Sequence, residues 1–227
     1  MRRSVYFLAL LCFLLPCFSS AEELRCPEHA DTEVRTDDPE SIVEICLATQ
    51  KALAFLADYN LAQKRAIRFE IIETPIDSSG YKAYGSYDSR SDLIRLMSYS
   101  AITSGLKNPQ MYGEPFDHEH YRGAIAHEVV HAVMQHNLTE KPISIGPQEY
   151  LAHATQLAVM PAERREALLR KLDVAPWESG DVISDIYMAI EPGKFAAKSY
   201  LHLTRMKDPL PFVQVLLNTK WFYVYVP

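Results

Sequence analysis

The hydrophobic pattern in the first part of the chain changes its period several times, and each change marks a predicted element. Across residues 38–60 apolar positions recur every three or four residues, which predicts a helix that Asp38 caps and Pro39 begins. Residues 66–74 are rich in β-branched and aromatic side chains, which is typical of a strand. Residues 22–38 are mostly polar, so we expect a loop there.

The middle of the chain changes from a strand pattern to a helical one. Residues 81–98 predict two strands around a turn at 88–92, and an irregular connector follows at 103–115. From 117 to 137 the pattern is helical, with alanine, valine and methionine dominating. A break at 138–147 precedes a further predicted helix at 148–160.

The last part of the chain predicts more helices and an apolar tail. Residues 162–172 form a short amphipathic pattern, and a helix is expected around 185–205 with an interruption at Pro192 and Gly193. The tail, 211–227, is strongly apolar and either packs on the core or presents an interaction surface. The order of helix, strands and helices indicates an α+β fold, with a small β-sheet packed beside a helical bundle.

The first 21 residues are expected to be removed from the mature protein. They combine two arginines, an apolar run and the small residues Ser19, Ser20 and Ala21, which is the pattern of a secretory signal peptide. A retained signal anchor is the alternative. We therefore expect a secreted or periplasmic protein in which residues 22–227 form a single domain without a stable membrane span.

Composition and cysteine content narrow the choice of partner and compartment. Removal of the two signal arginines changes the formal net charge from −6 to −8, which argues against nucleic acid or an anionic membrane as a partner. Two of the four cysteines remain, Cys26 and Cys46, and an oxidising compartment favours a disulfide between them. The alternative, a reactive free thiol, lacks a neighbouring group that would activate it.

A metal-binding pattern lies inside the apolar helix predicted at 117–137. In AIAHEVVHAVM, His127 and His131 are four residues apart, so a helix directs both imidazoles toward one point, and Glu128 lies at the edge of that face. Paired histidines also occur on ordinary helix surfaces. Here the surrounding residues are apolar, and burying three polar groups without a partner would cost about 1–3 kcal/mol each. The pattern favours a zinc site, in which Glu128 can reach a water molecule at the open coordination position.

A catalytic zinc site needs a third protein ligand, and Glu149 is the candidate. It follows His131 by 18 residues, across a turn-rich connector that can reverse the chain and bring a second helix against the first. A carboxylate at this position also stabilises the start of a helix, which is the structural alternative.

The arrangement His127-Glu128-x-x-His131 followed by Glu149 resembles the gluzincin group of zinc metallopeptidases, over about residues 121–160. The resemblance implies a zincin-like fold, with an active-site helix and a following ligand helix. It further implies that Glu149 binds Zn²⁺ and that the residue four positions later supports a zinc-ligand histidine. That residue is Asp in the group and His153 here. His153 could accept a hydrogen bond from a ligand, bind zinc itself, or pair with Glu149.

The resemblance implies hydrolysis of peptide bonds in a peptide or protein substrate. A zinc-activated water would attack the bond, with Glu128 as general base. An oxyanion stabiliser is also needed, for which Tyr187, Tyr200 and His202 are candidates. Because the chain has 13 tyrosines, a core or surface position is the favoured interpretation of each tyrosine. Gluzincins place a strand at the edge of the cleft, and the 81–97 hairpin could supply it.

The remaining histidines give weaker signals. His118 and His120 could form a second metal site, but the start of a solvated helix is the favoured interpretation. His29 and His136 have no ligand spacing.

Three hypotheses follow. The first is a secreted zinc peptidase. The second is a catalytically inactive zinc-binding pseudopeptidase that acts as an extracytoplasmic interaction module. The third is a disulfide-tied binding domain in which the histidine motif is accidental and binds no zinc.

Overall fold

The computed structural model of the chain describes most of the sequence beyond the predicted signal peptide, which lies outside the described residues. The described residues are 22–36, 38–78, 81–138, 143–221 and 223–227.

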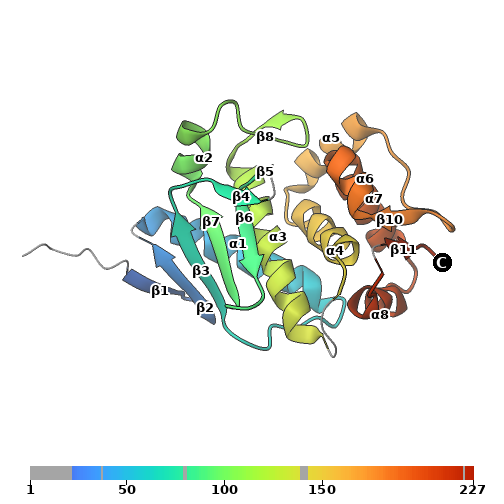
Figure 1. The fold of residues 1–227 in the computed structure, drawn as a ribbon, viewed down its shortest axis with the longest axis horizontal. Helices are drawn as coiled ribbons and strands as arrows, with labels where there is room; N and C mark the ends of the chain where they lie inside the picture. The colour runs from blue at the N-terminus through green and yellow to red at the C-terminus, as the bar shows by residue number, and fades with distance from the viewer. Residues whose placement is uncertain (1–21, 37, 79–80, 139–142, 222) are drawn as a thin grey trace, which may run out of the picture.

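A five-stranded mixed sheet forms the left half of the molecule in Figure 1, in the order β1-β2-β3-β7-β6. The three central strands run parallel, and both outer strands are antiparallel to their neighbours. The strands are Glu22–Cys26 (β1), His29–Thr36 (β2), Ile67–Ile72 (β3), Gly85–Asp88 (β6) and Leu93–Met97 (β7).

Four helices pack one on another from the sheet into the other half of the molecule. Helices α1 (Pro39–Ala57) and α3 (His118–Asn137) pack against the sheet and each other, and α3 runs along β6. Helix α4 (Ile145–Ala158) packs on α3, and α7 (Pro192–Arg205) packs on α4 (Figure 1).

The remaining elements are short. The helices are α2 (Tyr99–Gly105), α5 (Ala162–Leu172), α6 (Asp185–Ile190) and α8 (Leu210–Asn218). Three two-stranded ribbons pair β4 (Ile76–Ser78) with β5 (Tyr81–Ala83), β8 (Gln110–Met111) with β9 (Glu114–Pro115), and β10 (Val182–Ser184) with β11 (Tyr223–Tyr225).

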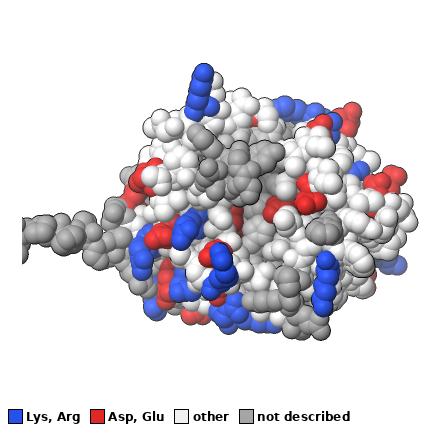
Figure 2. Space-filling model, viewed as in Figure 1, with Lys and Arg blue, Asp and Glu red and all other residues white. Residues whose placement is uncertain are grey.

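The two faces of the sheet have opposite chemistry because strand residues alternate between them. Ile67 and Phe69 of β3 are buried in the core, while Arg68 between them is exposed. On the outer face oppositely charged side chains pair across strands, as in the contact of Arg95 with Glu70. Figure 2 shows both signs of charge interspersed over this part of the surface.

The α+β fold class is confirmed, as are the helix predicted at 162–172 and the strand pair around 88–92. The loop predicted at 22–38 is wrong, because this segment forms β1 and β2. Thr32, Val34 and Thr36 are buried on one face of β2, so two of the three positions of this strand that are described as buried are threonines. Buried threonines give little hydrophobic signal in the sequence.

The predicted disulfide is confirmed. Cys26 at the end of β1 bonds to Cys46 in α1, with Cα atoms 5.4 Å apart, so the bond ties the first strand to the first helix. Within the described residues, every helix is too short or too polar to cross a membrane.

Candidate metal centre

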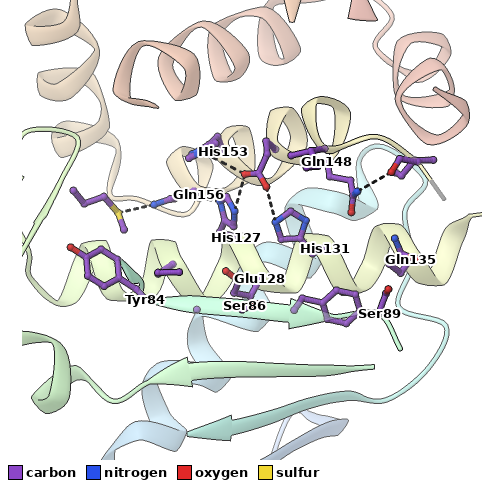
Figure 3. A pocket seen from close by; sticks show the side chains of 18 residues that line it. Tyr84, Ser86, Ser89, His127, Glu128, His131, Gln135, Gln148, His153 and Gln156 are labelled. Carbon is purple, nitrogen blue, oxygen red and sulfur yellow. Dashed lines mark hydrogen bonds and ion pairs between the residues drawn. The ribbon is translucent and has the colours of Figure 1, made fainter. Parts of the chain in front are cut away.

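Helix α3 presents the two motif histidines to a cavity between α3, α4 and β6. The side chain of Asp117 caps the helix by accepting a hydrogen bond from the backbone N–H of His120, which fixes where the helix begins. His127 and His131 lie one turn apart, with ring centroids 4.9 Å from each other. Both point toward α4 in Figure 3.

Helix α4 brings Glu149 between the two imidazoles, as the sequence predicts. One Glu149 oxygen lies 3.3 Å from His127 Nε2, and the other lies 3.5 Å from His131 Nε2. The three ligand atoms all lie within 4.8 Å of one another. Two imidazoles and a carboxylate are a donor set suited to Zn²⁺, so the residues present fit this ion.

The second contact of His127 is made by a residue that the sequence did not single out. Gln156 Oε1 lies 3.2 Å from His127 Nδ1, and its amide nitrogen contacts the sulfur of Met111. Gln156 follows Glu149 by seven residues, which is two helical turns, so both side chains lie on the same face of α4. That spacing is the signal that could have identified it.

His153 lies beside both Glu149 and the ring of His127, with the two ring centroids 4.8 Å apart. Its Nε2 lies 3.7 Å from Glu149, and its Nδ1 forms a 2.7 Å hydrogen bond with the Tyr112 hydroxyl. The structure shows the pairing of His153 with Glu149, and the other two roles considered for this residue stay predictions. Tyr112 was not predicted, because it lies in the turn between β8 and β9.

Burial and neighbouring charges shift the pKa values of the histidines and of Glu149 in opposite directions. Burial alone would lower the pKa of His127, but the Glu149 carboxylate outweighs it and raises that pKa to about 9. Burial lowers the pKa of His131 to about 4 and that of His153 to about 3, so both stay neutral near pH 7. Burial opposes ionisation of Glu149 too, yet the adjacent His127 holds its pKa well below the usual range. Near pH 7 an ionised Glu149 therefore pairs with a protonated His127, beside the neutral imidazoles of His131 and His153.

Glu128 lies on the side of α3 that faces β6. Its side chain is buried, and the backbone N–H of Tyr87 donates a hydrogen bond to its carboxylate. Burial raises the pKa of Glu128 to about 7. A carboxylate with a pKa near the working pH can both accept and release a proton.

The metal centre opens into a cavity of about 530 Å³. Among the described lining residues, charge is confined to the three histidines and two glutamates already discussed. The other lining residues are Ala83, Tyr84, Gly85, Ser86, Tyr87, Ser89, Met111, Ala124, Gln135, Ile143, Ile145, Gln148 and Gln156.

The three candidate oxyanion stabilisers make their contacts outside the residues described as lining this cavity. Tyr187 packs against Trp177, Tyr200 lies under the guanidinium of Arg165, and His202 bonds to Tyr150. Tyr200 and His202 belong to α7, and α4 lies between α7 and α3 (Figure 1). Tyr187, Tyr200 and His202 are not among the described residues that line the cavity.

The histidines before the motif also differ from expectation. His120 is fully buried between the carboxylates of Asp117 and Glu114, so it is not part of a solvated helix start. His118 stacks on Tyr99 at the surface. In the part of the chain that the structure describes, His127, His131 and Glu149 are the one group of three side chains that could hold a metal ion.

Comparison with known proteins identifies the family and goes no further. The chain belongs to DUF6639, a family of unknown function, whose sequence profile matches residues 32–225. No curated protein and no solved structure matches the chain. The matched segment contains all three candidate ligands and Glu128.

Proposed function

We propose that this protein is a secreted zinc-dependent peptidase with His127, His131 and Glu149 as metal ligands. The observation that carries the proposal is the convergence of these three side chains from two helices, beside a buried carboxylate. Catalytic zinc sites have three protein ligands and an open position. The disulfide between Cys26 and Cys46 supports an oxidising, extracytoplasmic compartment.

The residues around the centre support acid–base chemistry. Zinc bound by the three ligands would supply a Lewis acid next to Glu128. Glu128 accepts the proton of the attacking water and returns it to the leaving amine. Gln156 holds His127 by its second ring nitrogen, and His153 is held by Tyr112. These contacts fix the orientation of the side chains around the reacting atoms.

The cavity supports a substrate class as well as a reaction. Strand β6 lies at the edge of the sheet and lines the cavity, so an extended peptide can pair with those outer backbone groups of β6 that Glu128 does not occupy. Apart from the histidines and glutamates of the candidate centre, the described lining is uncharged, which favours uncharged side chains near the cleaved bond. Peptides with Lys or Asp beside that bond should therefore be cleaved more slowly than their Ala or Ser counterparts, as measured by kcat/KM.

An inactive zinc-binding protein is the second candidate. It is favoured by the position of Tyr187, Tyr200 and His202, since none of them is among the described residues that line the cavity. In that case the same three ligands would bind zinc without turnover, and the protein would act as an extracytoplasmic interaction module.

Two substitutions test the proposal. His131→Ala should abolish stoichiometric zinc binding, as measured by metal analysis of the purified mature chain. Glu128→Gln should retain zinc and lower peptide hydrolysis by at least about 100-fold, because a general base contributes that much. Undiminished hydrolysis by Glu128→Gln would exclude the mechanism. Zinc binding without hydrolysis by the wild type, across a varied peptide library, would support the inactive protein instead.

A further inference from the structure

Strand β6 approaches the helix that carries Glu128 more closely than a side chain would allow. A Cβ atom built on Gly85 would lie 2.8 Å from Glu128 Cγ and 3.0 Å from Glu128 Oε1. Contacts under 3.0 Å essentially never occur between real Cβ atoms and their neighbours. The absence of a side chain at Gly85 is therefore what lets the Glu128 side chain lie against the strand.

The same strand binds the end of this side chain. The backbone N–H of Tyr87, two residues after Gly85, donates to the Glu128 carboxylate. Alternate residues of a strand direct their backbone groups to the same edge. Gly85 thus provides the space for Glu128, and Tyr87 provides the hydrogen bond.

Strand β6 is itself held on two sides, so it cannot easily move away. It pairs with β7 along its whole length, from Gly85 to Asp88. Beyond its end, Asp92 accepts hydrogen bonds from the Tyr87 hydroxyl at 2.6 Å, from Arg65 at 2.8 Å and from His136 at 3.1 Å. His136 belongs to α3, so Asp92 ties the strand pair to the helix that carries Glu128.

We infer that strand β6 fixes the position of the Glu128 carboxylate, and that Gly85 is a positioning residue for the proposed reaction. The three atoms nearest to a methyl group at position 85 all belong to Glu128. Such a methyl group displaces Glu128 rather than the strand, because β6 is held on two sides while the Glu128 side chain can change rotamer. The expected loss of activity rests on the proposed function. The expected loss of stability rests only on the contact between Gly85 and Glu128.

The catalytic consequence is tested with Gly85→Ala and a matched control, Gly105→Ala. A Cβ at Gly105 meets nothing within 4 Å. In the zinc-loaded protein, Gly85→Ala should lower kcat by about 100-fold, with KM and zinc stoichiometry unchanged, because small misplacements of reacting groups cost about that much. Gly105→Ala should behave as the wild type. A wild-type kcat in zinc-loaded Gly85→Ala, or loss of its zinc, would overturn the inference.

The structural consequence is tested by a double-mutant cycle that needs no turnover. Gly85→Ala should lower Tm by at least about 3 °C in the wild-type background and by much less in a Glu128→Ala background, where the contact is absent. Equal losses in both backgrounds would overturn the inference. If Gly85→Ala alone does not fold, folding of Gly85→Ala/Glu128→Ala supports the inference and failure of the double variant opposes it. If the wild type binds zinc but cleaves no peptide, the proposed function is wrong. The double-mutant cycle would still show whether β6 holds Glu128 in place.

Discussion

At the scale of single residues, a neutral side-chain amide contacts the second ring nitrogen of His127 in the candidate centre. Gln156 contacts His127, and Gly123 on the facing helix leaves room for it, since a Cβ there would lie 3.0 Å from Gln156 Cγ. A glutamine orients the imidazole without adding negative charge to the centre. The ligands should therefore bind zinc less tightly than the same set backed by a carboxylate.

Gln156→Ala should lower zinc affinity by about 10- to 100-fold, because His127 then loses the contact that fixes its ring. Competition with a chromophoric chelator measures the effect. Gln214→Ala, in an exposed position of α8, is the matched control and should leave affinity unchanged. Equal affinities for the two variants would show that Gln156 does not orient the ligand.

Some residues of the candidate centre could be predicted from the sequence and others could not, for physical reasons. His127, His131 and Glu149 could be predicted because helical periodicity and the number of ligands that zinc requires restrict the choice. Tyr112 could not be predicted, because it reaches His153 from a turn 41 residues away. An oxyanion stabiliser could not be chosen from the sequence, because tyrosines and histidines also pack in cores, as Tyr187 and His202 do against other aromatic rings.

At the scale of elements, Asp92 makes the junction between the β6–β7 turn and α3 sensitive to acid. Burial opposes its ionisation, but its three hydrogen-bond donors outweigh this and lower its pKa to about 2, from an ordinary value of 3.8. The unfolded chain therefore takes up this proton first as the pH falls. The ionised Asp92 carboxylate therefore contributes fully to the free energy of unfolding above about pH 5, and this contribution is lost as the pH falls toward 2.

Asp92→Asn should therefore reduce the free energy of unfolding at pH 7 by an amount on the order of 2 kcal/mol and have much less effect near pH 2. Asparagine tolerates the left-handed backbone found at this position, where φ is 53°. Urea unfolding of both proteins across this pH range gives the difference. A difference that does not change with pH would mean that the ionised carboxylate contributes nothing.

The disulfide gives a second prediction at this scale. It joins residues 20 apart in the sequence, so its removal should lower the free energy of unfolding by about 3 kcal/mol, mainly by releasing the unfolded chain. Cys26→Ala/Cys46→Ala, compared with the oxidised wild type in urea, measures this. Zinc stoichiometry should stay the same, since both cysteines lie outside the metal centre. An unchanged unfolding midpoint would contradict the prediction.

Elements with local signals were predicted well, and those that depend on distant partners were not. The helix at 162–172 carries its own amphipathic pattern and ends as predicted. Strand β2 pairs in parallel with β3, some 35 residues later, and buries two threonines. Because its stability comes from that pairing rather than from its own apolar residues, its sequence resembles a loop.

At the scale of the whole molecule, the three ligands join two helices that pack directly on each other. A ligand that binds only the folded chain stabilises it by mass action, by about 2.7 kcal/mol at 100 times its Kd. Zinc should therefore raise the Tm of the wild type, and a chelator should reverse the change. Calorimetry of wild type and His131→Ala tests this, and an equal zinc response in both would place the bound ion elsewhere.

Arg165 stabilises the end of α4 from outside the candidate metal centre. Its guanidinium donates to the carbonyls of Ala158 and Met160 at 3.1 and 3.0 Å, and thus closes the last turn of α4 from the following helix, α5. The helix that carries Glu149 is completed by a segment that supplies no ligand. A miniature peptide cut to 118–158 would keep every candidate ligand, yet its second helix would end without this cation. Redesign of the centre as a small catalyst should start from a chain that extends through α5.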